Sequence, residues 1–303
     1  MIFYIATTFR EFDGSANDQI QRLFLERLSS ESEVDIKLIV TTFGERNVKK
    51  TLDEYMLNYE IFEEEKNNYR FSLTNVLLNA INNSYINPND FVIWTTCDVI
   101  FDHNFFLSIK NHAQMCTKGI SIVSHPHLIF SDIQALKDNR YVIHGPNDGI
   151  DFLGFSGAAL SEDFKRDIKL NFFSDWGVFE HFLVAVAVKN NLKRINLFSE
   201  TKAKKICNDR LVNNENDKYF QMSLNKNWPV LNDYIKKYSL SKKFKYLVYC
   251  NLQYSIPSII NLIVYRIRFT ANYASYTKLS IKSFISSKIP YKLKCKIKKV
   301  LIK

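Results

Sequence analysis

A carboxylate stands directly after an apolar run in the middle of the chain. Residues 91–96 read FVIWTT, and Cys97 and Asp98 follow them. A run this rich in β-branched and aromatic side chains predicts a strand that is buried on both faces. A carboxylate at the end of such a strand can hold Mg²⁺ or Mn²⁺, and the cation in turn neutralises a diphosphate. The alternative reading is that Asp98 only caps the helix that follows.

A second group of ionisable side chains lies at the start of an apolar helix. Residues 172–183 read FFSDWGVFEHFL. Glu180 falls inside the apolar stretch, where a carboxylate is costly unless it is paired or functional. Asp175 can cap the helix, act chemically, or do both. His181 could complete a metal site through a ring nitrogen, or it could be a hydrogen-bonded histidine of the core.

Alternating strands and helices must position these side chains. Ser15 and Asp18 form a capping-box pattern that predicts a helix between the first two apolar runs. Four apolar runs are expected as buried strands, at residues 2–7, 35–42, 91–96 and 119–124. The alternation predicts an α/β fold with a mostly parallel, Rossmann-like sheet covered by helices. Ligands of such sheets bind beyond the carboxyl ends of the strands.

The composition is that of a globular protein with a basic end. The 303 residues are 46% hydrophobic and carry a formal net charge of +10. Residues 241–303 hold 14 of the basic residues and no acidic one, so the first 240 residues are mildly acidic. The five cysteines form no CxxC pair, which favours a reduced, cytoplasmic setting over a zinc ribbon or a disulfide framework.

The basic end has the pattern of a segment that lies on a membrane. Its lysines alternate with isoleucine, leucine, phenylalanine and tyrosine, which suits an anionic membrane surface. Residues 246–265 carry no charge and are long enough to span a bilayer, but Asn251, Gln253 and Pro257 lower their hydrophobicity. A solvated basic helical subdomain and, more weakly, a nucleic-acid-binding segment are the other readings.

The stretch FVIWTTCDVIFDHNFF at 91–106 resembles the Asp-x-Asp region of GT-A nucleotide-sugar glycosyltransferases, in the form of family-2-like bacterial enzymes. In that pattern a strand is followed by Asp-x-Asp, an apolar pair and a helix. Asp98 matches the second, metal-binding Asp, and Thr96 stands where the first Asp usually sits. The resemblance covers about residues 1–200. It implies a GT-A-like fold and a Mn²⁺ or Mg²⁺ ion at Asp98, which His181 could help to hold.

Other segments match the same family in order and spacing. IATTFRE at the first strand end matches the donor-nucleotide loop, and VTTFGE at the second matches the segment that contacts the base. SLTNVLLNAI resembles the helix before the third strand. The resemblance therefore implies a donor site made of Thr7, Thr8, Arg10, Phe43, Glu45, Asn75, Thr96, Cys97 and Asp98.

The acceptor side follows from the same resemblance. In the family a Gly-rich segment, matched here by GFSGAALSED at 154–163, carries the acceptor loop. A helix then begins with an acidic residue that deprotonates the acceptor hydroxyl, which implies Glu180 or Asp175 as the general base. The residues expected to bind the acceptor are Asp151, Gly154, Phe155, Ser156, Gly157 and Trp176.

The predicted function is transfer of a sugar from a nucleotide-diphosphate sugar to a glycan or lipid-linked glycan. The resemblance implies O-antigen or capsule assembly, with inversion expected and retention left open. Three parts are expected: a catalytic domain at 1–200, a polar connecting segment at 201–240 and a basic amphipathic, helical tail at 241–303. The tail would hold a cytoplasmic protein on the inner face of the cell membrane.

Two other functions fit parts of the sequence. A nucleotidyltransferase shares the sheet topology, although ATTFREFDG lacks the G-x-G pattern expected after its first strand. A non-catalytic, membrane-associated protein that binds nucleotide sugars or acts as a scaffold is favoured by Thr96 in place of an acid. Nucleic acid is not an expected partner.

Overall fold

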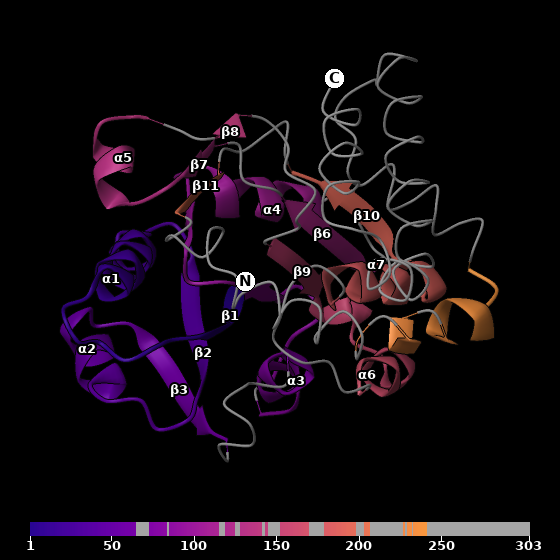
Figure 1. Cartoon of the computed structure of the whole chain (residues 1–303). Coiled ribbons are helices and arrows are strands. Elements are labelled where there is room, and N and C mark those ends of the chain that lie inside the picture. Colours follow the sequence, from indigo (N-terminus) through magenta and orange to yellow (C-terminus); the bar gives the residue numbers. More distant parts are fainter. Residues whose placement is uncertain are drawn as a thin grey trace, which may run out of the picture. The chain divides into compact units, whose positions relative to one another are not determined.

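Figure 1 shows the computed structural model of the chain. It describes residues 1–64, 73–83, 85–114, 119–124, 128–140, 143–144, 152–169, 179–197, 203–206, 227, 229–231 and 233–240. The chain forms two compact units, Met1–Tyr254 and Ser255–Lys303, and every described residue belongs to the first. No helix within these ranges is both long enough and apolar enough to cross a membrane. The expected tail at 241–303 lies outside the described residues.

A seven-stranded sheet forms the centre of the first unit, in the order β10-β6-β9-β4-β1-β2-β3. Its strands are β1 (Ile2–Thr8), β2 (Asp35–Thr42), β3 (Asn58–Glu63), β4 (Phe91–Thr95), β6 (Ile120–Ser124), β9 (Phe152–Ser156) and β10 (Lys193–Asn196). Neighbouring strands are parallel throughout, except that β9 runs antiparallel to both β4 and β6. The predicted α/β fold with a mostly parallel sheet is confirmed.

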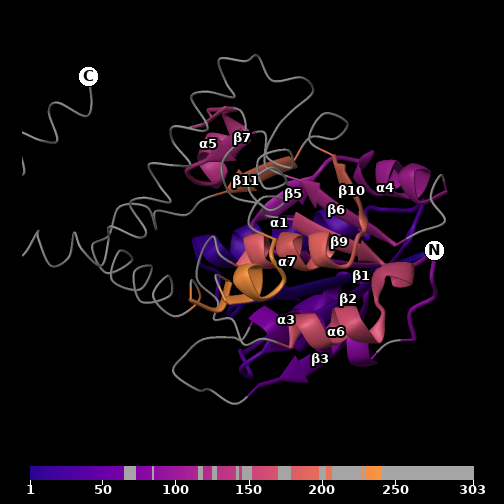
Figure 2. The same cartoon turned by 90° about the vertical axis from the view of Figure 1, so that its right-hand side faces the viewer.

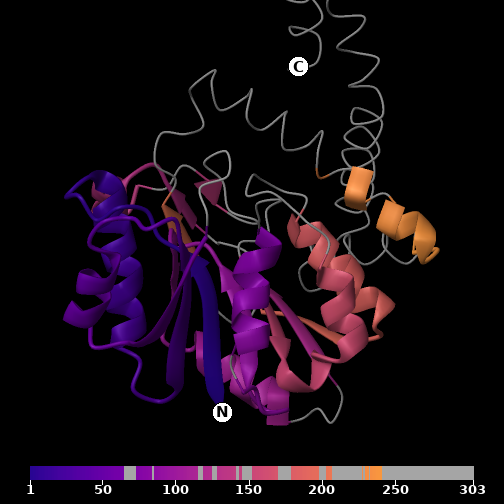
Figure 3. The ribbon, with the colours of Figure 1, turned by 90° about the horizontal axis from the view of Figure 1, so that it is seen from below.

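Helices cover both faces of this sheet. The helices of this unit are α1 (Ala16–Ser29), α2 (Val48–Glu54), α3 (Leu73–Asn83), α4 (Phe105–Gln114), α5 (Ile133–Lys137), α6 (Glu162–Ile168) and α7 (Phe179–Lys189), with a 3₁₀ turn at Gly157–Ala159. Helix α5 packs on α1 and on β7, which belongs to a second sheet. Figure 3 shows α1 and α2 on one side of the strands and α3, α6 and α7 on the other. Figure 2 looks onto the face that carries α3, α6 and α7. The strands β1, β4, β6 and β9 are therefore buried on both faces, which explains their nearly continuous apolar sequences.

The first helix begins where its capping pattern predicts. The Ser15 side chain accepts a hydrogen bond from the backbone N–H of Asp18. The Asp18 carboxylate in turn accepts one from Gly14 N–H at 2.6 Å and one from Arg22 Nε at 2.7 Å. Gly14 has a φ of +82°, which a glycine adopts without strain. Local polar contacts thus fix the point at which the loop after β1 turns into α1.

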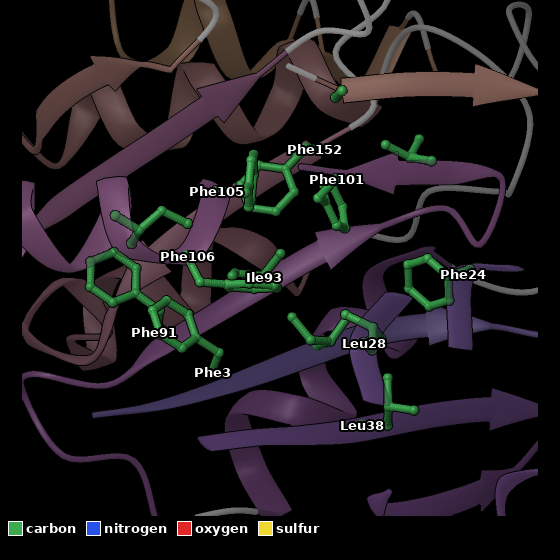
Figure 4. Packing of buried hydrophobic residues seen from close by; sticks show 14 of the residues in the cluster. Phe3, Phe24, Leu28, Leu38, Phe91, Ile93, Phe101, Phe105, Phe106 and Phe152 are labelled. Atoms are coloured by element: carbon green, nitrogen blue, oxygen red, sulfur yellow. The ribbon is translucent and has the colours of Figure 1, made fainter. Parts of the chain in front are cut away.

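Aromatic rings fill the core between the sheet and the helices α1 and α4 (Figure 4). The rings of Phe3 and Phe106 lie with centroids 5.0 Å apart, and Phe105 lies 4.4 Å from both Phe101 and Phe152. Such edge and offset contacts stabilise a core beyond the area that they bury. This cluster joins β1, α4, β5 and β9, so it fixes the end of β4 relative to the segment that follows it.

A second, four-stranded sheet extends from the end of β4. Its order is β5-β11-β7-β8, with β5 (Val99–Phe101), β11 (Ala203–Ile206), β7 (Leu128–Phe130) and β8 (Ile143–His144). The central strand β11 is antiparallel to β5 and parallel to β7. Strands from three distant parts of the sequence therefore meet next to Asp98.

Some elements differ from the expectation. The sequence reading contained neither α2 nor β3, because β3 is a half-exposed edge strand whose pattern is weak. The polar stretch 201–240 was expected only to connect, yet its described residues supply β11 and several buried side chains. Among these are Leu231, Tyr234 and Leu240, and the Tyr234 ring lies 5.2 Å from the ring of Phe182 in α7.

A buried carboxylate joins this last segment to the sheet-covering helices. Asp167 at the end of α6 is almost fully buried and lies 2.7 Å from the ammonium of Lys189 in α7. It also accepts hydrogen bonds from Asn190 at 3.1 Å and from Tyr238 at 3.4 Å. Burial, and then the charge of Asp167, raise the pKa of Tyr234. The carboxylate thus holds α6, α7 and residues 233–240 together.

Replacing this carboxylate should cost the protein much of its stability. We expect Asp167→Ala to lower the free energy of unfolding by about 3 kcal/mol, because Lys189 would be left without its buried partner. Chemical denaturation followed by circular dichroism measures the change. Asp163→Ala, on the same helix, is the control, since Asp163 pairs with Arg166 on the exposed surface and should contribute under about 1 kcal/mol. Equal effects of the two substitutions would contradict the assignment.

Candidate functional site

Polar side chains meet at one edge of the central sheet. Strands β1, β2, β4 and β6 run in the same direction, so their carboxyl ends lie together. Those ends carry Thr8, Thr42, Thr95 and Ser124. Open α/β sheets bind their ligands in the space beyond this edge. We call it the carboxyl edge.

The turn from β4 to β5 places Asp98 at the carboxyl edge. The hydroxyl of Thr96 donates a hydrogen bond to one carboxylate oxygen of Asp98. The backbone carbonyl of Asp98 accepts a hydrogen bond from Ile206 N–H at 3.0 Å. A third of the Asp98 side chain remains exposed, at 33%. The residue is thus held by its neighbours and is still accessible to a ligand.

A lysine that the sequence reading missed lies beside this carboxylate. The Nζ atom of Lys205 is 3.9 Å from the Oδ2 atom of Asp98. Lys205 belongs to β11 and is aligned with Val99 of β5. No local pattern in the sequence marks this lysine, because only the pairing of strands about a hundred residues apart brings it to the site.

The loop after β1 is attached to the same turn through Gln21 of α1. The Gln21 side chain accepts a hydrogen bond from Arg10 N–H at 2.6 Å and donates one to the Arg10 carbonyl at 3.3 Å. The thiol of Cys97 lies 3.8 Å from the same amide oxygen. Gln21 is buried on the apolar side of α1, and a polar residue at such a helical position was a signal that sequence reasoning could have used. Thr7 is buried within β1, and Thr8 ends that strand half-buried.

The pKa of the Cys97 thiol is shifted by burial and by the charges around it. Burial, followed by the negative charge of Asp98, raises its pKa to about 12. The positive charges of Arg10 and Lys205 act in the opposite direction. Two cations and one carboxylate are therefore close enough to the turn to influence its chemistry.

The loop after β2 is shaped by its own side chains. The Glu45 carboxylate accepts hydrogen bonds from Phe43 N–H at 2.7 Å and from the hydroxyl of Thr42. The Thr42 oxygen accepts bonds from the N–H groups of Gly44 and Glu45, each at 3.1 Å. Gly44 has a φ of +79°, which fits its type. Glu45, expected to contact the donor, is engaged in this turn and positions the half-buried Phe43.

Asn75 lies in the first turn of α3 and is exposed. Helix α3 packs on β1, β2 and β4, and it leads into β4. A helix that returns the chain to the next parallel strand begins near the carboxyl edge. Asn79, one turn further on, donates a hydrogen bond to Thr41 of β2 at 3.0 Å. The position of Asn75 is therefore consistent with the expected donor site.

The start of α7 brings Glu180 and His181 to the same edge of the sheet. Phe179 packs edge-on against Trp94 of β4, with centroids 5.4 Å apart. Glu180 lies in the first turn of the helix, and its Oε2 atom and the Nδ1 atom of His181 are buried. The partial positive charge of a helix N-terminus favours the ionised form of a carboxylate placed there.

The expected acceptor loop is instead a strand. Gly154, Phe155 and Ser156 are buried in β9, where Phe155 packs on Phe164 of α6 with ring centroids 4.8 Å apart. Because β9 is antiparallel, Ser156 is aligned with Phe91 at the start of β4. These residues therefore run towards the edge of the sheet opposite Asp98, away from the carboxyl edge.

Gly157 lies at that opposite edge too. Its N–H donates to the carbonyl of Asp90 at 2.7 Å, and a Cβ atom placed on it would be 1.9 Å from the carbonyl oxygen of Asn87. Close backbone packing, and not ligand binding, explains why a glycine stands here. The other expected acceptor and base residues, Asp151, Asp175 and Trp176, lie outside the described residues.

The described side chains do not fit a divalent metal site. Mg²⁺ and similar ions take one or two carboxylates and complete their shell with water and phosphate oxygens. Asp98 provides one carboxylate, but one of its oxygens accepts the Thr96 hydroxyl and the other faces the Lys205 ammonium. In the part of the chain that the structure describes, no three His, Cys, Asp or Glu side chains gather to hold a metal. The metal site expected at Asp98 and His181 therefore stays a prediction, and the groups around Asp98 argue against it.

Comparison with known proteins gives structural similarity at low sequence identity. No family model and no curated protein matches the chain. One similar structure is 4-diphosphocytidyl-2C-methyl-D-erythritol synthase from Anaerococcus prevotii, with a TM-score of 0.41, 14% identity and coverage of 65% of this chain and 88% of that one. Residues 1–349 of S. aureus TarS, solved with UDP, match with a TM-score of 0.46 and 10% identity over 69% of this chain and 62% of that one.

A third similar structure is the mannosyltransferase PcManGT from Pyrobaculum calidifontis, in complex with GDP-Man and Mn²⁺. Its TM-score is 0.40 and its identity 14%, over 68% of this chain and 56% of that one. The chain thus matches less than two thirds of the length of the TarS and PcManGT structures.

The raised pKa of Cys97 predicts slow alkylation. Iodoacetamide reacts with the thiolate, so at pH 7 we expect Cys97 to react about a thousandfold more slowly than a thiol of ordinary pKa. Its rate should rise about tenfold for each pH unit up to pH 10, without a plateau. Peptide mass spectrometry follows Cys97 separately from the other cysteines.

The positive charge of Arg10 lowers the pKa of the Cys97 thiol. Its loss in Arg10→Met should therefore raise this pKa and slow the alkylation of Cys97 further. Arg46→Met is the control, since Arg46 is exposed and pairs with Glu11 at 3.9 Å. If Cys97 reacted as fast as free glutathione at pH 7, the raised pKa of its thiol would be contradicted.

Proposed function

We propose that this protein is a glycosyltransferase that moves a sugar from a nucleotide-diphosphate sugar to a glycan or lipid-linked glycan acceptor. The observation that carries the proposal is the turn at Asp98. Its side chain is partly exposed at the carboxyl edge, and the cations of Arg10 and Lys205 act on the same turn. Cations at the ligand-binding edge of an open α/β sheet suit a diphosphate.

The donor nucleotide would lie across the ends of β1, β2 and β4. In this proposal Thr8 and Arg10 line the base and ribose from the first loop, and Phe43 contacts the base from the second, whereas Thr7 is buried within β1 and does not reach the ligand. The two loops are joined, because Phe12 N–H donates to the Arg46 carbonyl at 3.4 Å. Asn75 would reach the donor from the start of α3.

The acceptor would be activated from the start of α7. An inverting transfer needs a carboxylate that takes the proton of the attacking hydroxyl. We assign this role to Glu180 or to Asp175. Glu180 is supported by its place in the first turn of α7, next to Phe179, which packs on Trp94 near the end of β4.

We leave a divalent ion out of the proposal. The need for Mn²⁺ or Mg²⁺ remains a prediction of the sequence resemblance, and the described residues around Asp98 do not fit such an ion. We further propose that residues 241–303 bind the anionic inner face of the cell membrane, where lipid-linked acceptors of O-antigen or capsule type would be found. The proposal is supported by their 14 basic residues and the absence of acidic ones.

A screen of nucleotide sugars tests the donor. Because a ligand that binds only the folded state raises the melting temperature, we expect one base class among UDP, GDP, CMP and dTDP sugars to stabilise the protein. Transfer of the labelled sugar to a lipid-linked glycan should follow with the same donor. Release of pyrophosphate from a nucleoside triphosphate and a sugar 1-phosphate would show a nucleotidyltransferase, and stabilisation without any transfer would favour a binding protein.

The tail is tested by membrane binding. We expect the full chain to sediment with vesicles that contain anionic lipid, and a chain ending at residue 240 to stay in the supernatant while it still binds nucleotide. Raised salt should release the full chain, because screening weakens the attraction of lysines to the surface. Neutral vesicles are the control. Sedimentation that salt does not change would contradict surface binding and point to an inserted helix.

A further inference from the structure

The pairing of β11 with β5 fixes the position of Lys205. The backbone of Ile206 donates to Asp98, and Lys205 is aligned with Val99 across the two strands. The Lys205 side chain is mostly buried, with 18% of it exposed, whereas its neighbour Lys204 is exposed. The ammonium group of Lys205 is therefore held in one place, whereas the ammonium of an exposed surface lysine moves freely in solvent.

The carboxylate of Asp98 is engaged by groups that compete with a metal. Thr96 donates a hydrogen bond to one oxygen, and the Lys205 ammonium lies 3.9 Å from the other. A divalent ion bound to Asp98 would stand beside this ammonium, and two like charges at such a separation repel each other. The described donor set thus favours a fixed ammonium over a metal ion as the positive charge of the site.

A second cation acts on the same turn. Arg10 follows β1, and its backbone is held on both its N–H and its carbonyl by Gln21. The same Gln21 oxygen faces the thiol of Cys97, so the loop of Arg10 and the turn of Asp98 share one anchor. The backbone of Arg10 is therefore fixed beside the turn of Asp98, and its exposed, positively charged side chain acts on that turn together with Lys205.

We propose that Lys205, together with Arg10, stabilises the diphosphate leaving group, and that transfer requires no divalent ion at Asp98. This inference rests on the proposed function. Asp98 is then a positioning residue, whose carboxylate holds the Lys205 ammonium at the carboxyl edge.

The charge of Lys205 would matter most as the donor breaks. The bond between the anomeric carbon and the diphosphate oxygen is cleaved, and its electron pair stays on that oxygen. The acceptor oxygen bonds to the anomeric carbon, and its proton passes to Glu180 or Asp175. The diphosphate leaves with one more negative charge than it had in the donor. A preorganised ammonium that keeps its own proton stabilises this charge.

Binding of nucleoside diphosphates to the full chain tests the inference. UDP, GDP and dTDP are titrated by calorimetry in EDTA and in Mn²⁺, for the wild-type protein and for K205M, K205R and K204M. We expect the wild type to bind one of them equally well in both buffers. K205M should bind it at least about tenfold more weakly in EDTA, the loss expected for a charge-assisted hydrogen bond. K205R, which keeps the charge, and K204M, on the adjacent exposed residue, should bind nearly as the wild type does.

D98N gives a second measurement that does not depend on the folding of K205M. Because Asp98 holds Lys205 and no metal ion in this inference, D98N should weaken binding by the same factor, under about tenfold, in EDTA and in Mn²⁺. A loss in Mn²⁺ that is absent in EDTA would show that Asp98 holds a metal ion and would overturn the inference. Circular dichroism melting curves establish that each variant is folded.

The outcomes separate this inference from the proposed function. Binding of a nucleoside diphosphate only when Mn²⁺ is present would overturn the inference and leave the glycosyltransferase proposal standing. Binding in EDTA that K205M does not weaken would remove the role of Lys205 alone. Absence of binding in both buffers, together with absence of transfer, would overturn both.

Discussion

The register of the parallel strands is the constraint on which the rest of the structure depends. Buried backbone N–H and C=O groups must be paired, so β1, β2 and β4 can shift against each other only in whole steps of the hydrogen-bond ladder. In the observed register Thr8 is opposite Thr41, and Ala6 is opposite Trp94. The strands therefore end close to each other, and the polar residues that follow them converge. The candidate site is a consequence of this alignment and not of any single loop.

The parts of the fold that local pattern decides were predicted well. Strands β2 and β4 are apolar runs bounded by polar residues, and the capping of α1 by Ser15 depends on contacts within four residues. Strand β9 could not be recognised in the same way. It contains Gly154, and it is stable because it pairs with β4 on one side and β6 on the other, which no local pattern records.

The residues of the candidate site also fall into two groups, those that local pattern places and those that long-range contacts place. Asp98 and Arg10 follow strands that were recognised, so their place at the carboxyl edge could be predicted. Glu45 is expected from the sequence to contact the donor, but its carboxylate instead accepts hydrogen bonds from Phe43 N–H and the Thr42 hydroxyl within the loop after β2. Lys205 was missed because its position depends on a strand pairing between segments far apart in the sequence. Sequence reasoning thus found the residues set by the sheet and missed those set by long-range pairing.

The connection between the first two loops of the site has a consequence for how such a protein could diversify. Phe12 donates its N–H to the Arg46 carbonyl at 3.4 Å, and its own carbonyl accepts from the Asn47 side chain at 3.0 Å. Phe12 uses main-chain atoms in both contacts. Side chains at neighbouring positions such as Glu11 and Arg46 can therefore vary while the two loops keep their shape. Such a pair of loops would let new ligand preferences arise by single replacements, without rebuilding either segment.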